Sequence, residues 1–329
     1  MFMKIYIFPI ILLSPVIMMS CNSWFSIWMV MELNLMSFIP FIIFFNKFFK
    51  ELSIKYFIVQ AFSSSLLIIS SNLMFMNFFN IKILMILLIN LSLFMKIGSP
   101  PFHNWFINMM NNMNWMNCLM LSTWQKIIPM ISIMYMINKN LIYLMTIFSS
   151  IIGSIMALNH QSIRIILSYS SINHMSWMFM NLLINELIWM YYFLSYLLIN
   201  MSIMIILNKF NLFYINQFYS INMLIKNKFF ILLNFFSISS LPPMFGFTMK
   251  WISLYFFNIN FIQIILMLMI LMSIFSFMYY MRIYINIILN FKLLNKLILI
   301  NKFIYFNYSN NLIIMFSFIN MWMMSLWMF

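Results

Sequence analysis

Five ionisable side chains lie in otherwise apolar stretches of this sequence: Glu32, Lys96, Lys126, His174 and Lys250. A charge at the centre of a bilayer costs at least about 2.5–3.5 kcal/mol, so such residues mark ion routes by default. Removal from water disfavours the protonated form of an amine, whereas a nearby carboxylate favours it. A lysine whose carboxylate neighbour approaches or withdraws can hold or release a proton, and the pair titrates as a unit. These residues predict a proton relay.

Structural roles remain open for the same residues. A buried ion pair could simply lock helices together, and the side chain of Lys250 could extend to the membrane interface. His174 suits a relay because imidazole titrates near physiological pH, but a neutral histidine hydrogen-bonded between helices is an equally good interpretation. We interpret His103 and His160 as polar contacts near interfaces, and Arg164 as an anchor at the start of its helix.

The composition requires membrane helices to position these groups. Charged residues make up 6% of the 329 positions and hydrophobic residues 66%, with a mean hydropathy of +1.03. A soluble domain carries about a quarter charged residues. Most of the uncharged runs reach the roughly 20 residues that cross a bilayer as a helix, and they show none of the alternation of barrel strands. The predicted fold class is an all-α polytopic membrane protein.

Eleven membrane-spanning helices are predicted, of which the fourth and the ninth are interrupted. Their approximate ranges are 4–21, 23–46, 55–79, 82–109, 116–137, 140–158, 163–184, 186–208, 229–256, 259–288 and 309–328.

The two interruptions are of the same kind. One is Pro100-Pro101 in KIGSPPFHNW, and the other is Pro242-Pro243 in SLPPMFGFTMK. A proline pair removes backbone donors and breaks a helix, and opened backbone at membrane depth must be buried in protein or face a wet cavity. We therefore expect residues 97–101 and 240–246 to be non-helical, with free carbonyls near Lys96.

The breaks lie five predicted helices apart, which favours two repeats of opposite topology, as in transporters with an ion pathway at the midplane. The predicted divisions are 1–138 for the first five-helix repeat, 139–289 for the second, and 290–329 for a connecting segment and a C-terminal helix.

The remaining features argue against other classes of function. The net charge is +14, but the lysines gather in short connections such as 47–50 and 226–228, which is typical of basic loops beside membrane helices rather than of a nucleic-acid surface. Cys21 and Cys118 are isolated in the sequence and fit no metal or redox spacing. The sequence contains no phosphate-binding glycine loop, metal-ligand cluster or nucleophile motif.

Codon bias shows in the residue usage. Forty methionines stand beside three glycines and no aspartate, although close helix packing in membranes favours small residues. This pattern indicates an AT-rich genome in which a second AT-rich codon reads methionine, as in animal mitochondria.

Six segments together carry a family resemblance. They are NSWFSIWMVMELNLMSFIP (22–40), KYFIVQA (55–61), KIGSPPFHNW (96–105), NWMNCLMLSTWQKIIP (114–129), LNHQSIRIILSYSSINHMSWM (158–178) and LPPMFGFTMKW (241–251). In their order and spacing the chain resembles the subunit 2 family of mitochondrial NADH:ubiquinone oxidoreductase (respiratory complex I), in its arthropod-like form.

The resemblance implies an antiporter-like subunit that couples NADH-to-ubiquinone electron transfer to proton translocation. It implies that Glu32 pairs with a central lysine, Lys96, that Lys126 is a connecting lysine, that His174 lies in the middle of the second half, and that Lys250 is a terminal lysine. It also implies no cofactor in this chain, with FMN, iron–sulfur clusters and ubiquinone in partner subunits.

The expected partners are the other membrane and accessory subunits of complex I and phospholipids, without nucleic acid, in the mitochondrial inner membrane. Two departures from the family pattern are Ser239-Ser240 in place of Gly-Gly, and the absence of an acidic residue near Asn108 and Asn111. A free-standing cation/proton antiporter and a structural membrane scaffold are the alternative functions.

Overall fold

The computed structural model describes residues 2–45, 50–74, 79–220, 225–242, 244–257 and 263–297. Within these ranges the chain is helical, apart from turns and one isolated antiparallel bridge between Ser162 and Tyr214. The predicted all-α class is confirmed. The predicted helix 309–328 lies outside the described residues.

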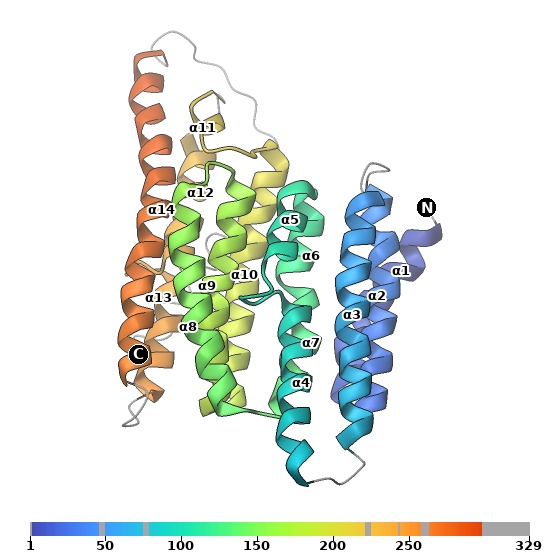
Figure 1. Ribbon diagram of the computed structural model, residues 1–329. Coiled ribbons are helices and arrows are strands. Elements are labelled where there is room, and N and C mark those ends of the chain that lie inside the picture. Colours follow the sequence, from blue (N-terminus) through green and yellow to red (C-terminus); the bar gives the residue numbers. More distant parts are fainter. Residues whose placement is uncertain are drawn as a thin grey trace. The chain divides into compact units, whose positions relative to one another are not determined.

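The chain forms two compact units, Met1–Phe148 and Ser149–Phe329. In the first unit α1 packs against α2, α2 against α3, and α3 against α4; the first three are drawn in blue in Figure 1. The helices that begin in this unit are α1 (Phe2–Met19), α2 (Trp24–Phe45), α3 (Lys50–Met74), α4 (Phe79–Ile97), α5 (Asn104–Asn112), α6 (Trp115–Ser122), α7 (Ile127–Tyr135) and α8 (Lys139–Ile155), which continues into the second unit.

The second unit is built around one helix that is buried along nearly its whole length. This is α9, and it packs against α10, α13 and α14. The helices of this unit are α9 (Ile163–Ile184), α10 (Glu186–Phe210), α11 (Gln217–Ser220), α12 (Ile225–Ser239), α13 (Phe245–Phe256) and α14 (Gln263–Leu297). Although α9 carries serines, asparagines and a histidine, its neighbours enclose these polar groups.

Five of the described helical segments are long and apolar enough to cross a membrane. They are Trp24–Phe44, Lys50–Met74, Lys139–Asn159, Glu186–Phe210 and Gln263–Ile288. Several other predicted spans are divided into shorter helices by interruptions. Large apolar side chains also face outward, such as Ile264 and Tyr255, which are 83% and 72% exposed. Such a surface suits lipid or other membrane subunits, and the count of eleven spans stays a prediction.

The first predicted break is present, and its geometry is that of a helix C-cap. Helix α4 ends at Ile97, and Gly98 follows with φ +76°. The amide of Ser99 donates to the carbonyl of Phe94 (3.2 Å), and that of Gly98 donates to Met95 (3.2 Å). This pair of bonds is a Schellman motif, in which a left-handed residue closes the helix. Helix α5 resumes after the proline pair.

The second predicted break repeats the same motif. Helix α12 ends at Ser239, and Ser240 has φ +60°. The amide of Leu241 donates to the carbonyl of Phe236 (3.3 Å), and that of Ser240 donates to Ser237 (3.2 Å). In both breaks the left-handed residue lies two positions before the proline pair, so the two interruptions are alike in backbone geometry as well as in sequence.

Close packing at the second break depends on a glycine. A Cβ atom placed on Gly246 would overlap the carbonyl oxygen of Ser237. No other residue fits there without moving α13 away from α12. The first turn of α13 therefore lies directly against the end of α12.

A third break contradicts the prediction of one continuous helix over 116–137. Helix α6 ends at Ser122, a 3₁₀ turn covers Trp124–Lys126, and α7 begins at Ile127. The cause is Pro129, which has no amide hydrogen for the carbonyl of Gln125 and whose ring crowds that carbonyl. The tighter 3₁₀ turn accommodates the mismatch and holds Gln125 and Lys126 in a buried position.

The left-handed serine gives a first prediction. Replacing Ser240 by glycine should stabilise the second break by about 1 kcal/mol, because a left-handed conformation costs a residue with a side chain about 1–2 kcal/mol. Hydrogen–deuterium exchange at the amides of Ser240 and Leu241 should slow by roughly fivefold. As a control, Ser65→Gly, at an exposed position in the middle of α3, should destabilise that helix by about 0.5–1 kcal/mol. Faster exchange at the break in Ser240→Gly would contradict the interpretation.

Candidate functional site

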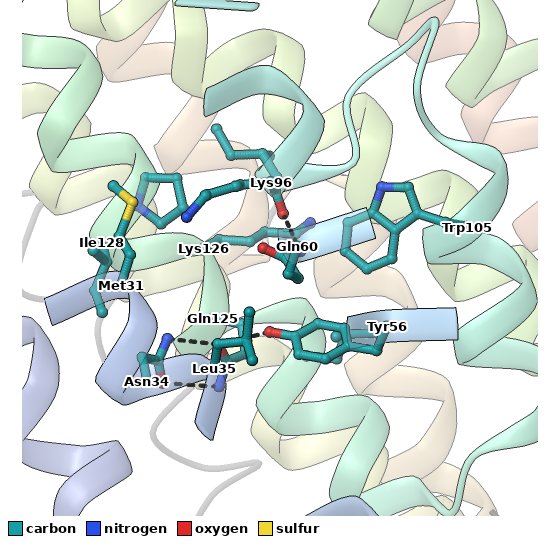
Figure 2. Close-up of a pocket in the computed structure, with 13 residues that line it drawn as sticks. Met31, Asn34, Leu35, Tyr56, Gln60, Lys96, Trp105, Gln125, Lys126 and Ile128 are labelled. Carbon is teal, nitrogen blue, oxygen red and sulfur yellow. Dashed lines mark hydrogen bonds between the residues drawn. The ribbon is translucent and has the colours of Figure 1, made fainter. Parts of the chain in front are cut away.

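A small polar cavity lies inside the first unit, beside the first helix break. Its volume is about 20 Å³, which exceeds the roughly 10–15 Å³ that one water molecule requires. Figure 2 shows the two lysines and Gln60 near one another, with the hydrogen-bonded Asn34 and Gln125 below them. The lining residues are Met31, Asn34, Leu35, Tyr56, Gln60, Lys96, Ile97, Trp105, Leu121, Gln125, Lys126, Ile128 and Pro129.

Lys96 reaches this cavity from the last turn of α4, and its side chain is 6% exposed. A cation in this position is favoured by the partial negative charge at the helix C-terminus. The backbone carbonyl of Lys96 has no helical donor, because Pro100, four residues later, has no amide hydrogen. The Nε2 of Gln60 on α3 donates to this carbonyl (3.2 Å).

The carbonyls of Phe94, Met95 and Lys96 at this break already accept hydrogen bonds. This corrects the expectation that they are free to surround the amine. The carbonyl of Phe94 accepts from Gly98 and Ser99, and that of Met95 accepts from Gly98 and from the indole Nε1 of Trp105 (3.1 Å). Gln60 occupies the carbonyl of Lys96. An unmade hydrogen bond in a buried site costs about 1–3 kcal/mol, so the protein supplies donors from its own side chains.

Lys126 is the second amine that lines the cavity. Its side chain is 2% exposed, and its Nζ lies 4.7 Å from the ring centroid of Phe106. An ammonium group over an aromatic face gains roughly 0.5–2 kcal/mol. Phe106 and the cavity-lining Trp105 both belong to α5, the helix that follows the first break. The break therefore brings α5 against both lysines.

Glu32 acts on Lys96 through the electric field rather than through direct contact. The Glu32 carboxylate interacts electrostatically with the Lys96 amine, but within the described residues the two form no ion pair closer than 4.0 Å. The Oε1 atom of Glu32 is buried and has no hydrogen-bond partner among the residues described. The structure thus brings Glu32, Lys96 and Lys126 into one unit and places the two lysines on one cavity.

A hydrogen-bonded side-chain cluster forms the opposite wall of the cavity. The Nδ2 of Asn34 donates to the Oε1 of Gln125 (2.7 Å), and the Nε2 of Gln125 donates back to the Oδ1 of Asn34 (3.2 Å). The hydroxyl of Tyr56 donates to the same Oε1 (3.4 Å). Side chains from α2, α3 and the 3₁₀ turn therefore meet at one point.

The second unit contains the other two predicted relay residues. His174, in the middle of the buried helix α9, has its Nδ1 2.9 Å from the hydroxyl of Tyr192 on α10. The ring centroids of His174 and Tyr196 lie 5.2 Å apart. This bond between helices fits a proton relay and a purely structural histidine equally well.

Lys250 is buried on α13, and its Nζ lies 5.6 Å from the ring centroid of Trp177. Trp177 is three residues beyond His174 on α9, so Lys250 lies against the turn of α9 that follows His174. The burial of Lys250, which is 8% exposed, contradicts an extended side chain at a wet interface in this structure.

Three other predicted residues have local roles. Arg164 lies in the first turn of α9 with its guanidinium 4.5 Å from the ring centroid of Phe213, which agrees with an anchor at the helix start. His103 contacts the carbonyl of Pro101 (3.2 Å). His160 stacks on Tyr169 with a centroid distance of 5.5 Å.

Sequence reasoning missed one buried cation and the amide cluster. Lys228 was assigned to a basic loop, but α12 begins at Ile225 and the Lys228 side chain is only 2% exposed. Asn34 and Gln125 were not singled out, although both lie within two residues of a predicted relay residue. The proximity of Gln125 to Pro129 is the signal that could have indicated a special backbone at this point.

The sequence and the fold of this chain are both similar to those of known membrane proteins. Residues 21–278 match the model of a family described as NADH:quinone oxidoreductase/Mrp antiporter, TM. The chain belongs to this family. NADH-ubiquinone oxidoreductase chain 2 of Locusta migratoria is 36% identical over 287 residues, which cover 85% of this chain and 84% of that protein. The protein of the same name from Anopheles gambiae is 39% identical over 259 residues, covering 75% and 74%.

Solved structures with the fold of this family show the same arrangement of helices. A chain of respiratory complex I from Thermus thermophilus aligns with a TM-score of 0.75 at 18% identity, over 84% of this chain and 68% of that chain. A chain of an archaeal membrane-bound sulfane sulfur reductase aligns with a TM-score of 0.81 at 15% identity, over 97% and 72%. Both likenesses support an antiporter-like membrane fold.

The bond from Gln60 gives a second prediction. Replacing Gln60 by leucine should destabilise the first break by about 1–3 kcal/mol, because the buried carbonyl of Lys96 loses its donor. Exchange protection around residues 96–99 should fall in the assembled membrane complex. The matched control is Ser65→Ala, an exposed position on the same helix, which should leave these amides unchanged. Equal protection in Gln60→Leu and wild type would show that another group satisfies the carbonyl.

Proposed function

We propose that this chain is a proton-translocating, antiporter-like membrane subunit of respiratory complex I. In this proposal it is part of an H⁺-translocating NADH:ubiquinone reductase whose redox chemistry, with FMN, iron–sulfur clusters and ubiquinone, takes place in partner subunits. Its family and its relatives named NADH-ubiquinone oxidoreductase chain 2 support this assignment. The chain then works among other membrane and accessory subunits and phospholipids in the mitochondrial inner membrane.

The observation that carries the proposal is the pair of buried lysines on one water-sized cavity. The whole chain has 17 basic and three acidic side chains, and Glu32 is the acidic residue whose charge acts on Lys96. Two ammonium groups around one small cavity disfavour each other. A single proton shared between Lys96 and Lys126 is therefore better tolerated than two, and its position responds to the charge of Glu32.

The proposed transfer needs only these groups and one water molecule. Protonated Lys96 gives a proton to water in the cavity, and this water gives a proton to the neutral amine of Lys126. When Glu32 is ionised it favours the proton on Lys96. When Glu32 withdraws or its field is screened, the proton is released toward Lys126. The cation–π contact with Phe106 stabilises Lys126 in its charged form.

In the second unit we assign corresponding roles to His174 and Lys250. His174 exchanges a proton through one ring nitrogen while Tyr192 fixes the other, and Lys250 holds a proton beside Trp177. His174 belongs to α9 and Lys250 lies against it, and the buried serines and asparagines of α9 offer polar neighbours along its length.

The finer architecture also belongs to the proposal. We infer eleven spans and two inverted five-helix repeats, 1–138 and 139–289, with a connecting segment and last helix in 290–329. The matching C-cap motifs at the two breaks support related halves. Lys96 precedes its break and Lys250 follows the other one, so the lysines are not strict symmetry mates.

The third prediction tests the pair in the first unit. Lys96→Met and Glu32→Gln should each lower the number of protons translocated per NADH oxidised by the intact complex in proteoliposomes. The reason is that charges coupled by about 2–4 kcal/mol at an effective dielectric of 20 set where the proton resides. Exposed counterparts, Lys55→Met and Glu186→Gln, are the controls and should pump normally. Normal pumping by both cavity variants in fully assembled complex would favour a structural scaffold.

The fourth prediction concerns the second unit. Lys250→Met and His174→Gln should lower the proton-to-NADH ratio, because each removes a proton-holding group on or against α9. Lys209→Met, at an exposed position in the last turn of α10, should leave the ratio unchanged. If proton pumping persists in both variants while the Lys96 variant fails, the relay is confined to the first unit.

A further inference from the structure

We propose that Asn34 and Gln125 form a positioning clamp, which holds the Lys126 turn against helix α2 and is required for proton transfer between Lys96 and Lys126. This inference deepens the proposed function and rests on it. Asn34 and Gln125 are positioning residues in this assignment and carry no proton themselves.

The first observation is the geometry of the amide pair. Each amide donates one hydrogen bond to the other and accepts one in return, at 2.7 and 3.2 Å. Both side chains are buried. A reciprocal pair of this kind fixes distance and relative orientation together, whereas a single bond leaves rotation free. The pair therefore joins α2 to the 3₁₀ turn at a defined separation.

The second observation is the weakness of the backbone at this turn. Pro129 cannot donate to the carbonyl of Gln125, so the regular helical ladder is interrupted one residue before Lys126. Gln125 and Lys126 are adjacent in the chain, so the bonds that fix the Gln125 side chain also restrain the backbone next to Lys126. The side-chain bonds to Asn34 therefore stabilise a turn in which one backbone hydrogen bond of the helix is missing.

The third observation is a further donor from α3. The hydroxyl of Tyr56 lies 3.4 Å from the Oε1 of Gln125, and Gln60, one turn later on α3, holds the carbonyl of Lys96. Helix α3 therefore contacts both lysine-bearing segments through neutral side chains. This helix links the amide pair beside Lys126 to the backbone carbonyl of Lys96.

Amides suit this task because they neither gain nor lose protons near neutral pH. The clamp keeps the same hydrogen bonds when Glu32, Lys96 or Lys126 changes charge. A carboxylate or histidine in the same position would change its bonds during each transfer. Proton transfer depends on near-attack geometry, and displacements of about 1 Å can cost about a hundredfold in rate.

Two apolar variants of similar size, Asn34→Leu and Gln125→Met, test the clamp together with the double variant. Each single variant should lower the proton-to-NADH ratio of the assembled complex by at least half of the loss seen in Lys126→Met. The double variant should lose no more than the larger single loss, because the amides act as a unit. Asn90→Leu is the control, since Asn90 is a buried amide of α4 outside the cavity that bonds to the carbonyls of Ile86 and Met136.

Normal pumping in the assembled single variants, additive losses in the double variant, or an equal loss in Asn90→Leu would each overturn the clamp. If the apolar variants do not assemble, the exchanged pair Asn34→Gln with Gln125→Asn decides. The clamp predicts that each exchange alone lowers pumping and that the two together restore it. An exchanged pair that pumps no better than its single variants, or does not assemble, overturns the inference.

The Lys126→Met variant separates this inference from the function on which it rests. Normal pumping in Lys126→Met would refute the proposed relay itself. Lost pumping in Lys126→Met with normal pumping in the amide variants would refute only the clamp.

Discussion

An interrupted helix inside a membrane protein leaves backbone carbonyls that water does not reach, and the first unit is organised around satisfying them. Each unmet group costs several kcal/mol in a lipid environment. The first break supplies two amide donors from its own C-cap motif, an indole from α5 and an amide from α3. The positions of α3, α4 and α5 follow from these bonds, and so does the place of Lys96.

The same constraint explains how a chain with so few charges tolerates polar interior helices. Buried serines on α3 and α9 donate to carbonyls three or four residues earlier in their own helix. The hydrogen of each of these hydroxyls is therefore bonded within its own helix. Amides and tyrosines also form bonds between helices, as in the clamp around Gln125 and in the contact of Tyr284 with Ser239 (2.7 Å).

Charge and backbone are coupled at each lysine of the proposed relay. Lys96 stands at a helix C-terminus created by a proline pair, and Lys126 stands in a 3₁₀ turn created by another proline. Lys250 follows the second proline pair and lies one turn after Gly246, where α13 touches α12. At Lys96 and Lys126 a defect in the helical ladder makes a place where an amine is buried but is not surrounded only by apolar side chains.

The helical membrane class, the two proline-pair breaks and the five ionisable residues of the proposed relay follow from the sequence alone, because they depend on local composition and on proline chemistry. It also contained Pro129, yet a continuous apolar run made a single helix over 116–137 the simpler prediction. Local chemistry was therefore sufficient to predict most helix boundaries. It was not sufficient at Pro129, because the first turn of a helix often tolerates a proline.

Which side chains meet depends on how the helices pack against one another. Asn34 and Gln125 are 91 residues apart, and Gln60 and Lys96 are 36 apart. Helices that are apolar all round carry no stripe to indicate which face is buried, so the sequence does not specify how each one is rotated about its axis. Packing between helices sets that rotation. For this reason the sequence identified Lys96 and Lys126 separately, and the folded chain placed them on one cavity.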